Sequence, residues 1–115
     1  MRHHNANRKF GRVRKVRSGL LKSLVFGLVR DGSIMTTEAK AKELRPLMEK
    51  LITAGKSNNL SSKKLLISRV GIISASKISK ELSSKYADRK GGYTRITKLP
   101  DRKSDGSKMA IIELV

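Results

Sequence analysis

The chain has 115 residues, of which 37% are apolar and only 3% aromatic, so it can form one domain with a thin aliphatic core. Lys and Arg number 27 against 9 for Asp and Glu, which gives a formal net charge of +18 at pH 7. This charge favours nucleic acid as the partner, with an anionic membrane surface second, and the absence of cysteine excludes disulfides and thiolate metal sites.

The N-terminal stretch is basic and lacks apolar periodicity. Asp31 is the first acidic residue in the chain. Because such a segment cannot bury itself, we expect residues 1–11 to form an extended basic arm that becomes ordered on a partner. A single domain is expected over residues 12–115.

From about residue 12 to residue 30 the apolar pattern becomes helical. The predicted stripe consists of Val13, Val16, Leu20, Leu24 and Leu28, widened by Leu21, Val25 and Val29. Asp31-Gly32 is expected to end this helix, since Gly readily takes the left-handed conformation found at helix ends. Residues 33–36 are long enough for a short strand.

A second helix is expected to begin at Thr36 or Thr37, either of which can cap it. Its apolar face consists of Leu44, Leu47, Met48, Leu51 and Ile52. Pro46 removes a backbone hydrogen bond inside this helix, so we expect a kink or a break near Leu44. Residues 55–59 are expected to end it.

Two further helices and two strands complete the predicted fold. A third helix is expected from Ser61 or Ser62, and a fourth is expected with Ser74 as its cap. The inward positions are Leu65, Leu66, Val70 and Ile73 in the third helix and Ala75, Ile78, Leu82 and Tyr86 in the fourth. Residues 93–99 and 109–115 alternate like strands and are expected to form a hairpin with a loop of about eight residues. The fold class is therefore α+β: about four helices packed on one face of a small mixed three-stranded sheet, with a basic extended N-terminal arm.

No arrangement of residues in the sequence indicates catalysis. The acids lie mostly among Lys and Arg, and Glu38 with Lys42 and Glu81 with Lys85 have the spacing of surface helix ion pairs. His3 and His4 could ligate a metal, but no Cys or nearby acid completes a set of four ligands, so contact with RNA is the favoured interpretation. We predict no catalytic residue, no metal site and no cofactor.

Two basic clusters carry the nucleic-acid signal. The first comprises the arm and the start of the first helix, where Arg and Lys match phosphate oxygens: Arg2, His3, His4, Asn7, Arg8, Lys9, Arg12, Arg14, Lys15, Arg17 and Lys22. The second surrounds a glycine pair that would allow a phosphate to approach the backbone: Arg89, Lys90, Gly91, Gly92, Tyr93 and Arg95. An ordinary helix-to-strand turn with Tyr93 in the core explains the second cluster equally well.

Four stretches resemble the bacterial-type large-subunit ribosomal protein family numbered seventeen, from the first residue to the last. They are Met1-Arg2-His3 with Arg8-Lys9 and Gly11-Arg12, Thr36-Thr37 with residues 39–46, residues 89–96, and residues 109–115. The chain departs from the family at His4, where Arg is frequent, and at Lys15-Val16-Arg17, where the family often has Ser-His-Arg.

The resemblance implies a small α+β domain with a basic arm that binds large-subunit ribosomal RNA. It also implies neighbouring ribosomal proteins near the nascent-chain exit region and a structural role in translation without enzymatic activity. Because the similarity begins at Met1 and no secretory signal is visible, the bacterial cytoplasm is expected rather than an organelle.

Two other classes of protein fit the sequence less well. A basic DNA-binding or nucleoid protein would need a recognition helix with base-reading side chains, whereas the third and fourth predicted helices carry mostly Ser and Lys. A membrane-surface peptide would need bulky aromatics on a basic helix, and Phe26 is the only candidate in the first helix.

Overall fold

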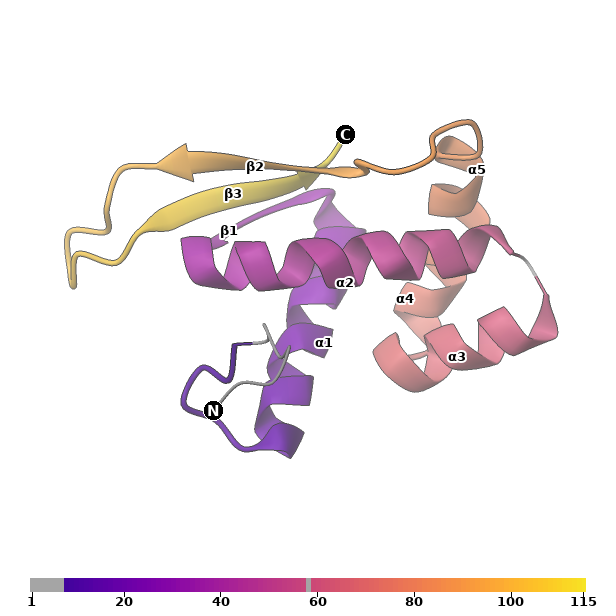
Figure 1. The fold of residues 1–115 in the computed structure, drawn as a ribbon, viewed down its shortest axis with the longest axis horizontal. Helices are drawn as coiled ribbons and strands as arrows, with labels where there is room; N and C mark the ends of the chain where they lie inside the picture. Colours follow the sequence, from indigo (N-terminus) through magenta and orange to yellow (C-terminus); the bar gives the residue numbers. More distant parts are fainter. Residues whose placement is uncertain (1–7, 58) are drawn as a thin grey trace, which may run out of the picture.

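The computed structural model describes residues 8–57 and 59–115 (Figure 1). The elements in chain order are α1 (Arg14–Asp31), β1 (Ser33–Thr37), α2 (Glu38–Lys56), α3 (Leu60–Val70), α4 (Ile72–Lys77), a π-helical turn η1 (Ile78–Leu82), α5 (Ser83–Lys85), β2 (Thr94–Leu99) and β3 (Met109–Leu114). The predicted α+β class and the predicted positions of the main elements are confirmed.

The three strands form one sheet in the order β1-β3-β2, and both pairings are antiparallel. The predicted hairpin is the β2–β3 pair, in which Ile96 lies opposite Ile112. The expectation of a mixed sheet was wrong. The C-terminal strand lies between the other two and runs opposite to both, so no parallel pair forms.

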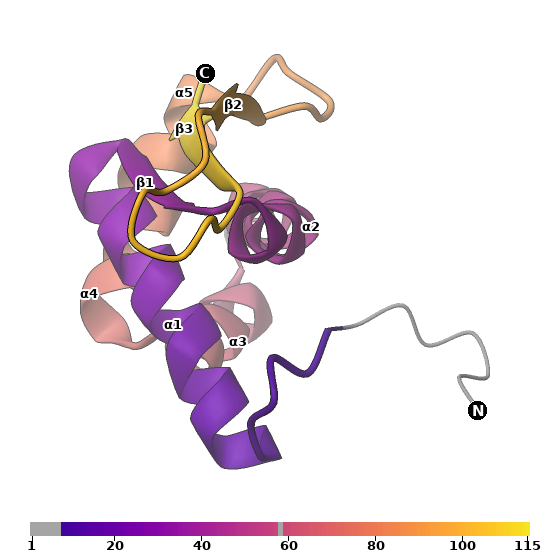
Figure 2. The same cartoon turned by 90° about the vertical axis from the view of Figure 1, so that its left-hand side faces the viewer.

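The helices lie against one face of the sheet, as predicted (Figures 1 and 2). Ala110 and Ile112 of β3 are fully buried, and Ile34 and Ile96 from the edge strands pack against the same core. The alternate residues point away from the helices, and Met35 on that outer face is 67% exposed.

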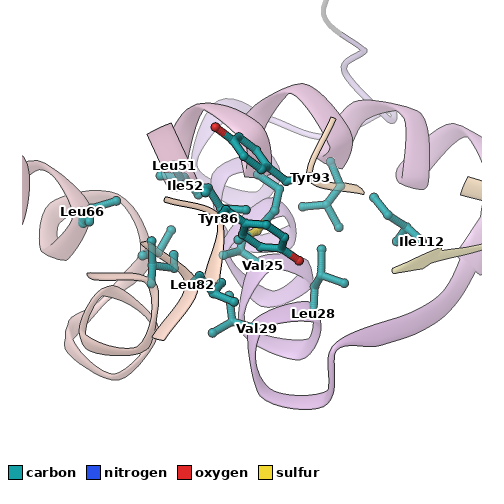
Figure 3. Close-up of a cluster of buried hydrophobic side chains, with 14 of the residues drawn as sticks. Val25, Leu28, Val29, Leu51, Ile52, Leu66, Leu82, Tyr86, Tyr93 and Ile112 are labelled. Atoms are coloured by element: carbon teal, nitrogen blue, oxygen red, sulfur yellow. The ribbon is translucent and has the colours of Figure 1, made fainter. Parts of the chain in front are cut away.

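Two tyrosines occupy the centre of the core between the helices and the sheet (Figure 3). The ring centroids of Tyr86 and Tyr93 are 5.1 Å apart, and both side chains are almost completely buried. The Tyr86 hydroxyl donates to the Val115 carbonyl at 2.5 Å, and the Val115 N–H donates to the Tyr93 carbonyl at 3.0 Å. These contacts attach the C-terminus to the core.

Only the C-terminal half of α1 is part of the core. Val25, Leu28 and Val29 are buried, whereas Val13 and Val16 are 70% and 54% exposed. The predicted stripe was therefore wrong for its first two positions. The first turns of α1 extend past the body of the domain, where no other described element covers them (Figure 2).

Helix α2 crosses the domain as one continuous element. The Thr37 side chain accepts from the Lys40 N–H and caps the helix, which confirms one of the two predicted caps. Of the kink or break predicted near Leu44, the break was wrong, because the helix continues across Pro46 to Lys56. The Glu38–Lys42 ion pair is present at 2.9 Å.

The start of α3 differs from the prediction. Asn59 is the cap, and its side chain accepts from the Ser62 N–H at 2.8 Å. Leu66 and Val70 are buried as expected, but Leu65 is 44% exposed. Leu65 was therefore wrongly placed in the core.

The chain from α4 to α5 forms one helical run with a π turn in its middle. Gly71 precedes α4, so Ser74 lies inside the helix and is not its cap, and Ile73 is 74% exposed. The core positions Ala75, Ile78, Leu82 and Tyr86 are confirmed. Glu81 and Lys85 do not form the expected ion pair in the part of the chain that the structure describes, because a π turn changes the four-residue spacing that brings such side chains together.

Gly55 permits α2 to approach this π turn closely. A Cβ atom at Gly55 would lie 2.9 Å from Ile78 Cγ2 and 3.4 Å from the Ile78 carbonyl oxygen. Close packing of α2 against η1 therefore explains why Gly55 is a glycine.

Candidate nucleic-acid interface

The described part of the arm contains a tight turn before α1. The Arg12 N–H donates to the Lys9 carbonyl at 3.0 Å, and the two residues between them have positive φ angles, 52° at Phe10 and 61° at Gly11. Positive φ at both central positions is the mark of a type I′ turn, which Gly11 adopts freely and Phe10 at a cost of about 1 kcal/mol. Arg12 Nη1 also donates to the Phe10 carbonyl at 2.9 Å. The arm therefore reverses direction here before α1 begins.

The cations around this turn and in the first turns of α1 are directed toward solvent. Arg8, Lys9, Arg12, Arg14, Lys15 and Lys22 are exposed, and Arg17 is half-buried. Within residues 8–57 and 59–115, none of these seven side chains forms an ion pair with an acid of the protein. Their charges are therefore available to an external anion.

The basic start of α1 is continuous with the face that is buried further along the helix. Arg14, Ser18, Leu21 and Val25 follow one another at intervals of four, three and four residues, which places them along one side of the helix. This side changes from cationic to apolar as α1 enters the domain, where Val25 is fully buried. The cations are consequently held at fixed positions by a helix anchored in the core.

A groove of about 270 Å³ separates this side of α1 from α3. Its floor is apolar, and Lys22 from α1 and Arg69 from α3 stand among the residues that line it. The full lining is Ser18, Leu21, Lys22, Val25, Leu47, Ser68, Arg69 and Val70. Arg69 is exposed and was missed in the sequence, since no local pattern indicates that α3 lies beside the start of α1.

Arg8 lies near the N-terminal end of α2. It shares a groove of about 410 Å³ with Glu38, Lys42 and Lys108. Glu38 is held by Lys42 at 2.9 Å and by Lys98 at 3.7 Å. The hydrogen bond from Lys42 is the main cause of the lowered pKa of Glu38. Glu38 therefore stays ionised among cations and offsets part of their repulsion.

The second predicted cluster is organised mainly by the protein's own contacts. Gly92 has a φ of 62°, which explains one glycine of the pair, while Gly91 does not have a positive φ. Tyr93 is 2% exposed, so the core interpretation of this side chain is the one that the structure supports.

Lys56, the last residue of α2, holds this turn in place through hydrogen bonds to Arg89 and Tyr93. Its ammonium group donates to the Tyr93 hydroxyl at 2.5 Å and also to the Arg89 carbonyl, and it lies 4.6 Å from the centre of the Tyr93 ring. The Tyr93 hydroxyl in turn donates to the Arg89 carbonyl at 3.0 Å. The hydrogen bond from Lys56 is the largest cause of the lowered pKa of Tyr93.

The remaining side chains of the second cluster are exposed. Arg95 pairs with Glu113 across the β2–β3 hairpin at 3.3 Å, and the Arg89 guanidinium donates to the Gly91 carbonyl at 3.2 Å. Lys90 is also exposed. The structure does not bring the two clusters together: α2 lies between the arm and the turn in both views (Figures 1 and 2).

Four of the predicted contact residues, Arg2, His3, His4 and Asn7, lie outside the described residues. In the part of the chain that the structure describes, no group of three or more His, Asp or Glu side chains is placed to hold a metal ion.

Comparison with known proteins identifies the family. Residues 20–115 match the family model described as "Ribosomal protein L17". The chain belongs to this family. Large ribosomal subunit protein bL17 of Gemmatimonas aurantiaca is 47% identical, over 100% of this chain and 98% of the relative. The proteins of the same name from Desulfotalea psychrophila and Nautilia profundicola are 43% and 42% identical, again over 100% of this chain, and are covered over 90% and 98% of their own lengths.

Membership of the ribosomal protein L17 family confirms the resemblance carried by the four sequence stretches. The protein is a non-enzymatic structural component of the ribosome. The family match begins at residue 20, so most of the first basic cluster lies before it, although the full-length relatives cover this region as well. Among the described residues no helix is long and apolar enough to cross a membrane.

Proposed function

We propose that this protein binds large-subunit ribosomal RNA through its basic arm and the projecting start of α1, and stabilises the folded RNA by neutralising its phosphates. The observation that carries this proposal is the set of seven arm and α1 cations that form no ion pair within the described residues. A rigid helix that presents Arg and Lys beyond the edge of its domain is suited to enter a folded polyanion.

The groove between α1 and α3 extends the proposed surface. Lys22 and Arg69 approach it from two helices, so a single phosphate or nucleotide placed there would meet cations from both sides. Arg89 and Lys90 form a second, smaller contact in this proposal, because they are exposed at the far side of α2. Residues 1–11 act as the RNA-binding extension, and residues 12–115 form the domain that anchors it.

The names of the relatives, which are large ribosomal subunit proteins, support large-subunit ribosomal RNA as the proposed partner. Neighbouring proteins near the nascent-chain exit region and a bacterial cytoplasmic setting are further parts of the proposal. No cofactor or small-molecule substrate is part of the proposal.

The test replaces Arg12, Arg14 and Arg17 with Gln and measures binding to large-subunit RNA over a range of salt concentrations. Every phosphate that is no longer neutralised should reduce the slope of log K against log salt by about one, hence by up to roughly three for the triple variant. A matched variant, in which the exposed Lys50, Lys64 and Lys103 become Gln, removes the same charge elsewhere. An equal reduction of slope in both variants would show that net charge, not the α1 surface, determines binding.

A further inference from the structure

Helices α3 and α4 expose large apolar side chains that take no part in the proposed RNA contacts. Nine large hydrophobic side chains of the described residues are exposed, and five of them fall between residues 60 and 73. They are Leu60, Leu65, Ile67, Ile72 and Ile73. Ile72 and Ile73 are 71% and 74% exposed, which is unusual for isoleucine in a domain with such a thin core.

Part of this surface is a groove of about 230 Å³ between the two helices. Its apolar wall consists of Ile67 from α3 and of Ile72 and Ala75 from α4. Lys63 and Lys80 also line the groove. The other lining residues, Ser76 and Ser79, are small. Leu60 precedes Ile67 by seven residues and so continues the same side of α3.

The two charged side chains that line this groove, Lys63 and Lys80, are both positive. Residues 60–80 contain no acidic residue, and the first acid after them is Glu81. A complementary occupant must therefore combine aliphatic side chains with carboxylates.

We propose that the α3–α4 groove docks an acidic amphipathic segment of a protein, with aliphatic side chains against Ile67 and Ile72 and carboxylates beside Lys63 and Lys80. An RNA strand would satisfy the lysines but would leave the isoleucines without an apolar partner, and no aromatic side chain lines the groove for base stacking. A second copy of this chain would place lysines against lysines between two molecules of charge +18.

The α3–α4 groove shares no lining residue with the α1–α3 groove, so the docking proposal does not depend on which residues contact RNA. It uses only the assignment of the protein to the large ribosomal subunit, where an occupant from a neighbouring or subunit-associated protein would be found.

The experiment places the photo-crosslinking amino acid p-benzoylphenylalanine at position 72 in one variant and at position 14 in another, and irradiates purified large subunits that contain each. Both positions are exposed, so neither change disturbs the core. We expect position 72 to crosslink to a protein segment rich in aliphatic and acidic residues, identified by mass spectrometry, and position 14 to crosslink to RNA.

A charge-reversed variant then tests whether Lys63 and Lys80 attract carboxylates of the docked segment. Lys63→Glu with Lys80→Glu should reduce the crosslink from position 72 by roughly tenfold or more, because like charges would face each other. Changing the acids of the identified segment to Lys should restore it. Crosslinking from position 72 to RNA, to a second copy or to nothing, or a yield unaffected by charge reversal, would overturn the docking proposal. Absence of the RNA crosslink from position 14 would instead contradict the proposed function.

Discussion

The two basic regions look alike in sequence but are built differently. In the arm and the start of α1, cations extend past the domain and form no ion pair with its described residues. In the turn from Arg89 to Arg95, the Tyr93 ring is buried in the core, and Lys56 of α2 donates a hydrogen bond to the Tyr93 hydroxyl. Arg95 forms an ion pair with Glu113. The difference teaches that a basic, glycine-containing motif can serve folding where its aromatic side chain is buried, whereas we propose binding for the exposed cations of the arm.

The largest expected effect is a loss of folding stability when the Tyr93 side chain of the second region is removed. Replacing Tyr93 with Ala should destabilise the protein by about 3–5 kcal/mol, because a buried aromatic ring beside Tyr86 would be removed. Tyr93→Phe removes only the hydrogen bonds to Lys56 and Arg89 and should cost about 1 kcal/mol. Urea denaturation measures both. An Ala variant of unchanged stability that no longer binds RNA would reverse the comparison and make Tyr93 a binding residue.

A smaller loss of stability is expected at Gly92. Its φ of 62° is left-handed, so Gly92→Val should cost about 1–3 kcal/mol in strain. Gly91→Val is the matched control, since Gly91 lacks a positive φ and a Cβ there would meet nothing within 4 Å. Thermal unfolding of the two variants compares the positions directly. Equal melting temperatures would show that the left-handed conformation is not required for the turn.

The contrast in binding can be measured with equal charge removal. Arg89, Lys90 and Arg95 changed together to Gln should reduce the salt slope of RNA binding by less than the Arg12, Arg14 and Arg17 variant, by about one or two rather than three. The reason is that Arg95 is already paired with Glu113 at 3.3 Å. A slope change equal to that of the arm variant would mean that both regions contact phosphates to the same extent.

The smallest effect concerns Glu38, the acid that borders the groove of Arg8. The hydrogen bond from Lys42, with smaller effects from Lys98 and Lys108, lowers the pKa of Glu38 from the usual 4.5. Since the folded pKa is depressed, this stabilisation is present above the unfolded value and is lost as pH falls through the folded one. Wild type should therefore exceed Glu38→Gln in stability at about pH 7, and the difference should shrink as the pH falls through the folded pKa. A difference that persists at acid pH would assign the effect of Glu38 to packing.

Much of the fold could be predicted because local patterns determine local structure. The caps and stops are examples: Thr37 begins α2, and Gly32, with a φ of 80°, ends α1 by donating its N–H to the Leu28 carbonyl. The alternation in β2 and β3 and the spacing of Ala75, Ile78 and Leu82 were likewise sufficient. The break considered near Leu44 did not occur, since packing of the surrounding α2 face keeps that helix continuous despite the hydrogen bond that Pro46 removes.

The sequence by itself determined the family, the charge that favours RNA, the α+β class and the positions of most elements, because these depend on composition and on patterns within a few residues. Only the tertiary structure decided which apolar side chains are covered. Val13 and Val16 continue the helical pattern of α1, yet no described element reaches them. It also placed Tyr93 in the core and Arg69 across a groove from Lys22. Such pairings join residues far apart in the chain, so they depend on how whole elements pack and leave no local pattern in the sequence.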